Sequence, residues 1–187
     1  MARRSSYPRA RPRRPRAVRR PAEGRRVHLR WAVAGDLGTL VRHRRRMWTE
    51  IRDYSSAELD RHGATYRRWA RERLAAGTFV AVLAETSDGA AVGSGAVWLM
   101  PMQPRPGPLG RPEMPYVLSM YTEPRYRGRG IASRIVRELL RWSRARGYGR
   151  IFLHASAAGR SVYARLGFRA GSEMRRALRP RASRGGR

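Results

Sequence analysis

Apolar and polar residues alternate with two different periods along the chain, and each period predicts an element. Residues 27–31 (VHLRW) alternate one by one, which predicts a strand. Asp36 precedes apolar positions at near-helical spacing that continue to Ile51, so we expect Asp36 to cap a helix. A second helix is predicted to follow Ser55 and to end at Gly77, because glycine commonly follows the last helical residue. The chain is therefore predicted to begin with a strand and two helices.

The middle of the chain predicts a hairpin followed by a third strand. Residues 78–84 are rich in strand-forming side chains, and residues 87–89 (SDG) are typical of a tight turn. Residues 90–100 would then return as the partner strand. Residues 101–115 are rich in proline and glycine and predict a loop, and residues 116–122 predict a long strand.

The last part of the chain alternates helix and strand signals. Residues 131–146 predict a helix, 151–155 a buried strand, 160–166 a short helix and 168–178 a final strand. The apolar stripe of the first of these helices comprises Ile131, Ile135, Leu139 and Trp142. The predicted order is β-α-α-β-β-β-α-β-α-β. A hairpin combined with a crossover helix indicates an α/β (α+β) fold, with a mixed, mostly antiparallel central sheet flanked by helices.

Both ends of the chain differ in composition from the rest. Residues 1–26 contain arginine, proline and serine with almost nothing apolar, so they predict a disordered tail that cannot pack. Residues 179–187 predict a basic C-terminal tail. One domain is therefore expected over residues 27–178, as a monomer or a homodimer.

The net charge of +29 comes from arginine alone, because the chain has no lysine. The charge is +10 over residues 1–26 and +6 over residues 175–187, which leaves +13 on the residues between. Such a surface attracts polyanions, including nucleic acid, and the arginine-rich tails are the expected contact. A coding bias towards arginine, alanine and glycine is the alternative explanation.

Composition also excludes several classes of protein. The chain has no cysteine, and its four histidines never fall at the spacing of a zinc-binding helix, so we expect no metal site. No apolar run has the length of a membrane span, and no apolar segment follows the N-terminal arginines as in a signal peptide. We therefore expect no membrane contact and a cytoplasmic location.

The most informative stretch is the turn between the third strand and the helix at residues 131–146. Gly128 and Gly130 lack a Cβ, so an anion can approach the backbone closely where the first N–H groups of a helix are unpaired. Arg125, Arg127 and Arg129 alternate through the turn and add positive charge. The pattern predicts a phosphate or pyrophosphate site, and the alternative is that the glycines merely let a helix begin.

Two common phosphate motifs do not fit this turn. A Walker loop needs a lysine, which the chain lacks. A dinucleotide fingerprint needs a third glycine, where the chain has Ser133, and an acidic residue about 20 positions later, where it has none.

The turn resembles the acetyl-CoA motif of the GNAT N-acetyltransferases. Arg125, Gly128 and Gly130 match the family signature Arg/Gln-x-x-Gly-x-Gly/Ala in place. Residues 163–168 (YARLGF) are similar to the family's Tyr-x-x-x-Gly-Phe. The order of elements matches as well, so the resemblance covers residues 27–178.

The resemblance implies a coenzyme site and a transfer of acetyl groups from acetyl-CoA to an amine. The implied cofactor-binding residues are Met120, Tyr121, Thr122, Arg125, Arg127, Gly128, Arg129, Gly130, Ile131, Ala132 and Ser156. Among them, N–H groups of residues 127–132 would hold the pyrophosphate, and the backbone of residues 120–122 would lie along the pantetheine arm. Ser156 stands where the family often has asparagine.

The resemblance assigns one catalytic role and leaves another open. Tyr163 is expected to act as general acid for the departing thiolate. The base that accepts the amine proton is left between Glu123, His154 and Glu50, and a free amine or a water relay is a further possibility.

The acceptor is expected to be a small-molecule or peptide amine, and the net charge disfavours polycationic acceptors. Two alternative functions stay open at this point. The first is a nucleic-acid-associated protein, and the second is an acetyl-CoA sensor that uses the same fold without turnover.

Overall fold

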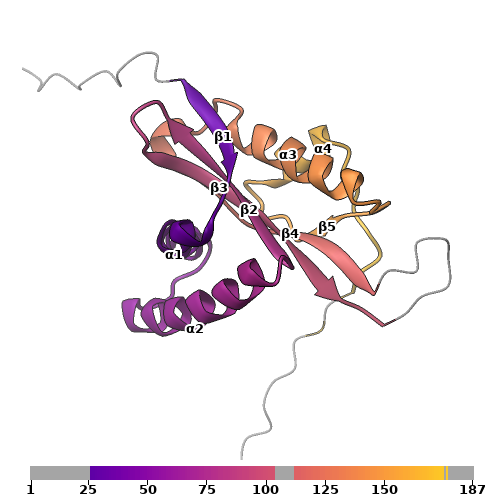
Figure 1. Ribbon diagram of the computed structural model, residues 1–187, viewed down its shortest axis with the longest axis horizontal. Helices are drawn as coiled ribbons and strands as arrows, with labels where there is room; N and C mark the ends of the chain where they lie inside the picture. The colour runs from indigo at the N-terminus through magenta and orange to yellow at the C-terminus, as the bar shows by residue number, and fades with distance from the viewer. Residues whose placement is uncertain (1–25, 104–111, 175, 177–187) are drawn as a thin grey trace, which may run out of the picture.

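The computed structural model describes residues 26–103, 112–174 and 176, and these residues form a five-stranded sheet with helices on both faces (Figure 1). The strands lie side by side in the order in which they occur along the chain. They are Val27–Trp31 (β1), Phe79–Thr86 (β2), Ala91–Pro101 (β3), Glu113–Thr122 (β4) and Phe152–Leu153 (β5). Pairs β1–β2, β2–β3 and β3–β4 are antiparallel, and β4–β5 is parallel. The predicted mixed, mostly antiparallel sheet is confirmed.

The helices divide between the two faces of this sheet. They are Leu37–Ile51 (α1), Ser56–Ala75 (α2), Ile131–Ala145 (α3) and Arg160–Arg165 (α4), with short 3-10 turns at Ala34–Asp36 and Pro124–Tyr126. Figure 1 shows α1 and α2 on one side of the sheet and α3 and α4 on the other. One core cluster joins α1 and α2 to β2 and β3, and the second joins α3 to β2, β3 and β4. Each face of the sheet therefore buries its own apolar layer.

Local sequence signals account for where the helices begin and end. At α2, Ser55 accepts a hydrogen bond from the N–H of Glu58, while the Glu58 carboxylate accepts from the N–H of Ser55. Gly77, with φ +68°, follows that helix. The apolar stripe predicted for α3 is buried at Ile131, Ile135 and Leu139, which confirms the helical period in that segment.

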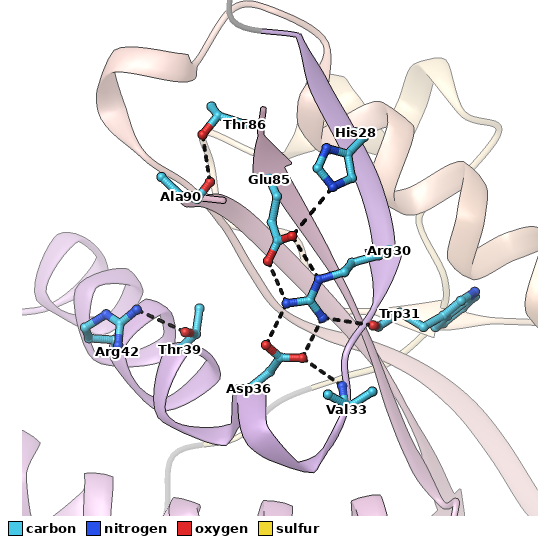
Figure 2. A network of polar contacts seen from close by, with 10 residues as sticks. All are labelled: His28, Arg30, Trp31, Val33, Asp36, Thr39, Arg42, Glu85, Thr86 and Ala90. Atoms are coloured by element: carbon cyan, nitrogen blue, oxygen red, sulfur yellow. Dashed lines mark hydrogen bonds and ion pairs between the residues drawn. The ribbon is translucent and has the colours of Figure 1, made fainter. Parts of the chain in front are cut away.

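Asp36 precedes α1 as predicted, but its carboxylate does not cap the helix. It pairs instead with the guanidinium of Arg30 on β1, at 2.6 and 2.7 Å, and accepts a hydrogen bond from the N–H of Val33. The same guanidinium holds both oxygens of Glu85 on β2, at 2.9 and 2.6 Å, as Figure 2 shows. Arg30 thus joins β1, β2 and the start of α1 through two bidentate pairs. These hydrogen bonds lower the pKa of Asp36 and raise that of Arg30.

Three predicted boundaries differ from the structure. The loop prediction for residues 101–115 is too long, because β4 begins at Glu113. The strand predicted over residues 151–155 shortens to the two residues of β5. The final strand predicted over residues 168–178 is wrong for residues 168–174, which form no strand. A strand forms only where it can hydrogen-bond to a neighbouring strand, which local sequence does not show. In the described part of the chain β5 pairs only with β4, so residues 168–174 add no strand beside it. Residues 175, 177 and 178 of that prediction lie outside the described residues.

Candidate active site

The predicted phosphate turn adopts the backbone that its glycines permit. Gly128 has φ +73° and Gly130 has φ +75°, and Gly130 is the residue that precedes α3. Both values lie in the left-handed region, which side chains with a Cβ avoid. A Cβ at either position would meet no protein atom within 4 Å, so the space above the turn is open. The unpaired N–H groups of the first turn of α3 therefore face a space where an anion can be accommodated.

The three arginines of the turn have different surroundings. Arg127 donates a hydrogen bond to the carbonyl oxygen of Thr122 at 2.9 Å, and its Nη2 pairs with both carboxylate oxygens of Glu50 on α1 at 2.6 and 2.7 Å. Arg129 lies over the ring of Tyr126, with its Cζ 5.3 Å from the ring centroid. Arg125 and Arg129 are exposed, and neither forms an ion pair within the described residues. They are the two guanidinium groups of this turn with no competing carboxylate.

β4 carries a bulge just before the turn. Gly95 of β3 lies opposite two residues of β4, Ser119 and Met120, and Ser119 has φ +54°. β5 pairs with β4 only through Tyr116 and Val117, so the later part of β4 has no partner strand on that side. The backbone of residues 120–122 therefore borders a gap where β4 and β5 separate.

Tyr163 and Ser156 lie at the other end of the motif region, around α4. Tyr163 is 9% exposed, its ring contacts Phe168 edge-on, and burial raises the pKa of its phenol. Its hydroxyl makes no hydrogen bond to any other described residue, so the phenol is free to serve a ligand. The hydroxyl of Ser156 accepts a hydrogen bond from the N–H of Gly159 at 3.2 Å, which leaves its own proton to donate.

The three candidate bases are all held by other side chains. Glu50 pairs with Arg127, as described above. Glu123 pairs with Arg46 of α1, and the hydroxyl of Tyr121 approaches its second oxygen at 3.4 Å. The ring of His154 lies between the hydroxyl of Tyr116, on its Nδ1, and the carboxylate of Glu173, 3.0 Å from its Nε2.

Two ion pairs of opposite polarity therefore link α1 to the glycine turn and the residue before it. Arg46 contacts Glu123 immediately before the turn, and Glu50, one helical turn later, contacts Arg127 within it. Sequence reasoning did not predict this link.

A buried histidine next to these groups was also missed. His43 of α1 is 1% exposed, and its Nδ1 lies 3.0 Å from the hydroxyl of Ser94 on β3. Its ring centroid is 5.1 Å from that of Tyr121. Burial lowers the pKa of His43 to about 4, so the ring is neutral near pH 7 and serves as a packed hydrogen-bonding group behind β4.

A cavity of about 590 Å³ lies between α1, α2 and the ends of β3 and β4. Six of the residues that line it are aromatic, namely Trp48, Tyr54, Tyr66, Trp69, Trp98 and Tyr116. Its lining also includes Arg44, Arg45 and His62, and among the described residues no aspartate or glutamate lines it. The tyrosine that contacts His154 is thus part of the cavity wall. This volume is in the range of small-molecule sites.

Within the described ranges, no group of three or more histidine, aspartate or glutamate side chains is arranged to hold a metal ion. None of the helices described there is long and apolar enough to cross a membrane.

Comparison with known proteins finds a family match over the part of the chain that contains the glycine turn and most of the cavity. The model of the acetyltransferase (GNAT) family matches residues 43–168, which include both predicted motifs and most of the cavity wall. No curated protein sequence matches the chain significantly.

Several solved structures are similar over nearly their whole length. A GCN5-related N-acetyltransferase from Ralstonia eutropha JMP134 is 26% identical, with a TM-score of 0.73, and the match covers 81% of this chain and 98% of that one. A predicted acetyltransferase from Clostridium acetobutylicum, solved with acetyl-CoA, is 26% identical with a TM-score of 0.71, over 82% and 96% of the two chains. An aminoglycoside acetyltransferase, AAC(6')-Iy, with a bisubstrate analogue is 18% identical with a TM-score of 0.59, over 84% and 99%, and shares the fold alone.

Proposed function

The chain belongs to the GNAT acetyltransferase family, and we propose that it transfers an acetyl group from acetyl-CoA to the primary amine of an acceptor, by direct attack in a ternary complex. The observation that carries this proposal is the open turn at Gly128 and Gly130, next to the gap between β4 and β5. The aromatic cavity gives an acceptor a place on the opposite face of the sheet from α3.

The coenzyme would bind along β4 and at the head of α3. N–H groups of residues 127–132 would hold the pyrophosphate, with the helix dipole and the exposed Arg125 and Arg129 adding attraction. The structure of the Clostridium relative was solved with acetyl-CoA, in agreement with this choice of coenzyme. The open β4 edge at residues 120–122 would hydrogen-bond the pantetheine amides, and Ser156 has a free proton to donate to the same arm.

In the reaction, the amine nitrogen attacks the thioester carbon, and the tetrahedral intermediate then expels the coenzyme thiolate. We propose that the phenol of Tyr163 donates a proton to the thiolate sulfur as it leaves. Because burial raises the pKa of this phenol, it stays protonated near neutral pH and can donate.

For the amine proton, the cavity favours a route through Tyr116 and His154. Tyr116 lines the cavity, whereas neither Glu50 nor Glu123 does. If Glu173 accepts the Nε2 proton of His154, then Nδ1 presents a lone pair to the Tyr116 hydroxyl. The amine proton would pass to the Tyr116 oxygen while the phenolic proton passes to Nδ1. Glu123, ion-paired to Arg46, is the second candidate from the sequence.

The test is release of free thiol from acetyl-CoA by the full chain, in the presence and absence of a panel of primary amines. Saturable, amine-dependent release with formation of the N-acetylated product is expected. Tight binding of acetyl-CoA without release for any amine would contradict the proposal and favour a sensor without turnover.

The arginine-rich tails, apart from Arg26, lie outside the described residues, and we propose that they are dispensable for this chemistry. A protein spanning residues 27–178 should keep its affinity for acetyl-CoA. Any affinity of the full chain for nucleic acid should fall steeply with salt and disappear on truncation. Equal DNA binding by the shortened protein would place the polyanion site on the folded domain.

A further inference from the structure

We propose that the acceptor carries a carboxylate next to its amino group and an apolar or aromatic side chain, as in an apolar α-amino acid, and that Arg44 binds this carboxylate. The inference rests on the proposed function, because it names the substrate class of the same site.

The walls of the cavity indicate what its occupant looks like. Trp69 packs edge-on against both Phe79 and Trp98, and stacks on Tyr66 with ring centroids 5.8 Å apart. These rings pack against one another, so the protein's own side chains form an apolar wall. Apolar and aromatic groups bind such a wall through the area they bury. The side chain of the acceptor is therefore expected to be apolar.

Arg44 places a positive charge within this apolar surrounding. Its Cζ lies 4.4 Å from the centroid of Tyr66 and 5.5 Å from that of Trp48, and its Nη1 donates to the Ser119 hydroxyl at 3.2 Å. No described carboxylate lies within ion-pair distance of it. Burial lowers the pKa of this guanidinium, which means that its charge is incompletely compensated by the protein. A carboxylate on the ligand would supply the missing anion through two parallel hydrogen bonds.

The neighbouring arginine is a useful contrast. Arg45 also lines the cavity, but its Nε donates to Asp60 of α2 at 3.1 Å. Arg44 is thus the lining guanidinium that lacks an acidic partner in the described part of the chain.

A further buried group in the same corner lacks a partner. The hydroxyl of Tyr66 is inaccessible to solvent, and makes no hydrogen bond within the described residues. It lies close to Ser119, which Arg44 also contacts.

The charges of the cavity also argue against a polycationic acceptor. Aminoglycosides and polyamines carry several ammonium groups, and acidic side chains are the groups that compensate several positive charges at once. Within the part of the chain that the structure describes, no aspartate or glutamate lines the cavity, and two arginines do. The chain therefore shares its fold with AAC(6')-Iy, but we do not expect it to share the aminoglycoside acceptor of that enzyme.

The position of Arg44 limits the distance between the acceptor's carboxylate and its amine. The guanidinium contacts Ser119, which lies in the β4 bulge directly before residues 120–122, where the pantetheine arm is proposed. A carboxylate held there would lie close to the proposed path of the pantetheine arm. An α-amino group, one carbon from the carboxylate, fits this separation, while the side chain extends towards the aromatic wall.

The test uses the intrinsic fluorescence of the full chain, because three of its five tryptophans, at positions 48, 69 and 98, line the cavity. Two matched pairs of probes differ only by the carboxylate: L-phenylalanine with phenethylamine, and L-leucine with 3-methylbutylamine. Each amino acid should bind at least about 10-fold more tightly than its amine. Equal binding of the two members of a pair, tighter binding of the amines, or no quenching by any of the four would overturn the proposal.

Variants locate the effect at one side chain. Arg44→Gln should reduce the preference for the amino acid over its amine to less than about 3-fold. Arg44→Lys keeps the positive charge but not the planar guanidinium that binds a carboxylate with two hydrogen bonds, so its preference should lie between those of the unaltered chain and Arg44→Gln. Arg42→Gln is the matched control, since Arg42 lies on the same helix, donates to Thr39 and does not line the cavity. A preference that survives Arg44→Gln in a protein with unchanged thermal unfolding would contradict the assignment.

Thiol release from acetyl-CoA with the same four probes separates the two proposals. Acid-selective binding without thiol release would leave the carboxylate site standing and would refute the transfer reaction for these acceptors. Thiol release that is as fast with the two amines as with the two acids would support transfer and refute the role of Arg44.

Discussion

Replacing Gly130 by alanine should separate the cost of backbone strain from the loss of coenzyme binding. With φ +75°, Gly130 holds a conformation that costs an L-residue about 1–2 kcal/mol. The added methyl group meets no atom within 4 Å, so strain is the whole cost to the free protein. A loss of about 1–2 kcal/mol lowers the melting temperature of a domain of this size by roughly 2–8 °C.

The effect on the ligand should be larger than the effect on the fold. The methyl group would occupy the space through which a phosphate approaches the N–H groups of α3. Losing one hydrogen bond to a charged group costs about 1.5–3 kcal/mol, which raises the Kd for acetyl-CoA by about 10- to 150-fold. Isothermal titration calorimetry with acetyl-CoA measures this directly, at a temperature where both proteins are folded.

Gly77→Ala provides the control, because Gly77 has φ +68° and its Cβ would also meet nothing within 4 Å. It follows α2, far along the chain from the motif. The two variants should lose similar stability, and only Gly130→Ala should lose affinity. The reasoning is refuted if Gly130→Ala binds acetyl-CoA as tightly as the unaltered chain, or if Gly77→Ala weakens binding equally.

Three other substitutions test separate parts of the structure. Tyr163→Phe should lower kcat by about 10- to 1,000-fold while the Kd for acetyl-CoA stays constant; a large loss of affinity would make this residue a binding contact and not an acid. Arg30→Met should destabilise the fold by about 1–3 kcal/mol at pH 7 in urea unfolding. The pKa of Asp36 is lowered in the folded state, so its pairing with Arg30 stabilises the fold above the unfolded pKa of about 3.9, and this stabilisation is lost as the pH falls through the folded pKa. The difference in unfolding free energy between the two proteins should therefore shrink below about pH 4, and a constant difference would contradict this. Gly95→Ala places a Cβ 2.8 Å from Cγ2 of Ile135 and against the sulfur of Met120, so it should lower the unfolding free energy by about 1–3 kcal/mol. Because the displaced Met120 lies in the β4 bulge, acetyl-CoA binding should weaken as well, and a crystal structure of the variant with an unmoved bulge would refute this link.

The features that sequence predicted well are those decided by near neighbours. The start of a helix after Ser55, the hairpin turn at Gly89 and the glycine turn before α3 each depend on a few consecutive residues. The period of the apolar residues in α3 likewise fixes which face is buried. These signals are local, and the structure confirms them.

The cavity could not be predicted because its walls come from four elements and a connecting loop that are far apart in sequence. The run of arginines at 42, 44, 45 and 46 shows why side-chain roles were equally hidden. In the sequence these residues are equivalent, yet one contacts Thr39, one the aromatic wall, one Asp60 and one Glu123. Helical geometry directs each to a different side, and only the packed neighbours give each its partner. The final strand was wrong over residues 168–174 for a related reason, because a strand forms only beside a neighbouring strand and these residues pair with none of the described strands.

Helix α1 faces both proposed ligands, and this has a thermodynamic consequence. One side of the helix supplies Arg44 and Trp48 to the cavity, while Arg46 and Glu50 pair with Glu123 and Arg127 around the coenzyme turn. A phosphate that draws Arg127 away from Glu50 removes one of the two restraints on this helix. The two binding equilibria then share an element, and linkage requires that their coupling be reciprocal: acetyl-CoA changes the acceptor's affinity by the same factor as the acceptor changes that of acetyl-CoA. Either substrate would therefore change the affinity for the other through a helix that supplies no proposed catalytic residue.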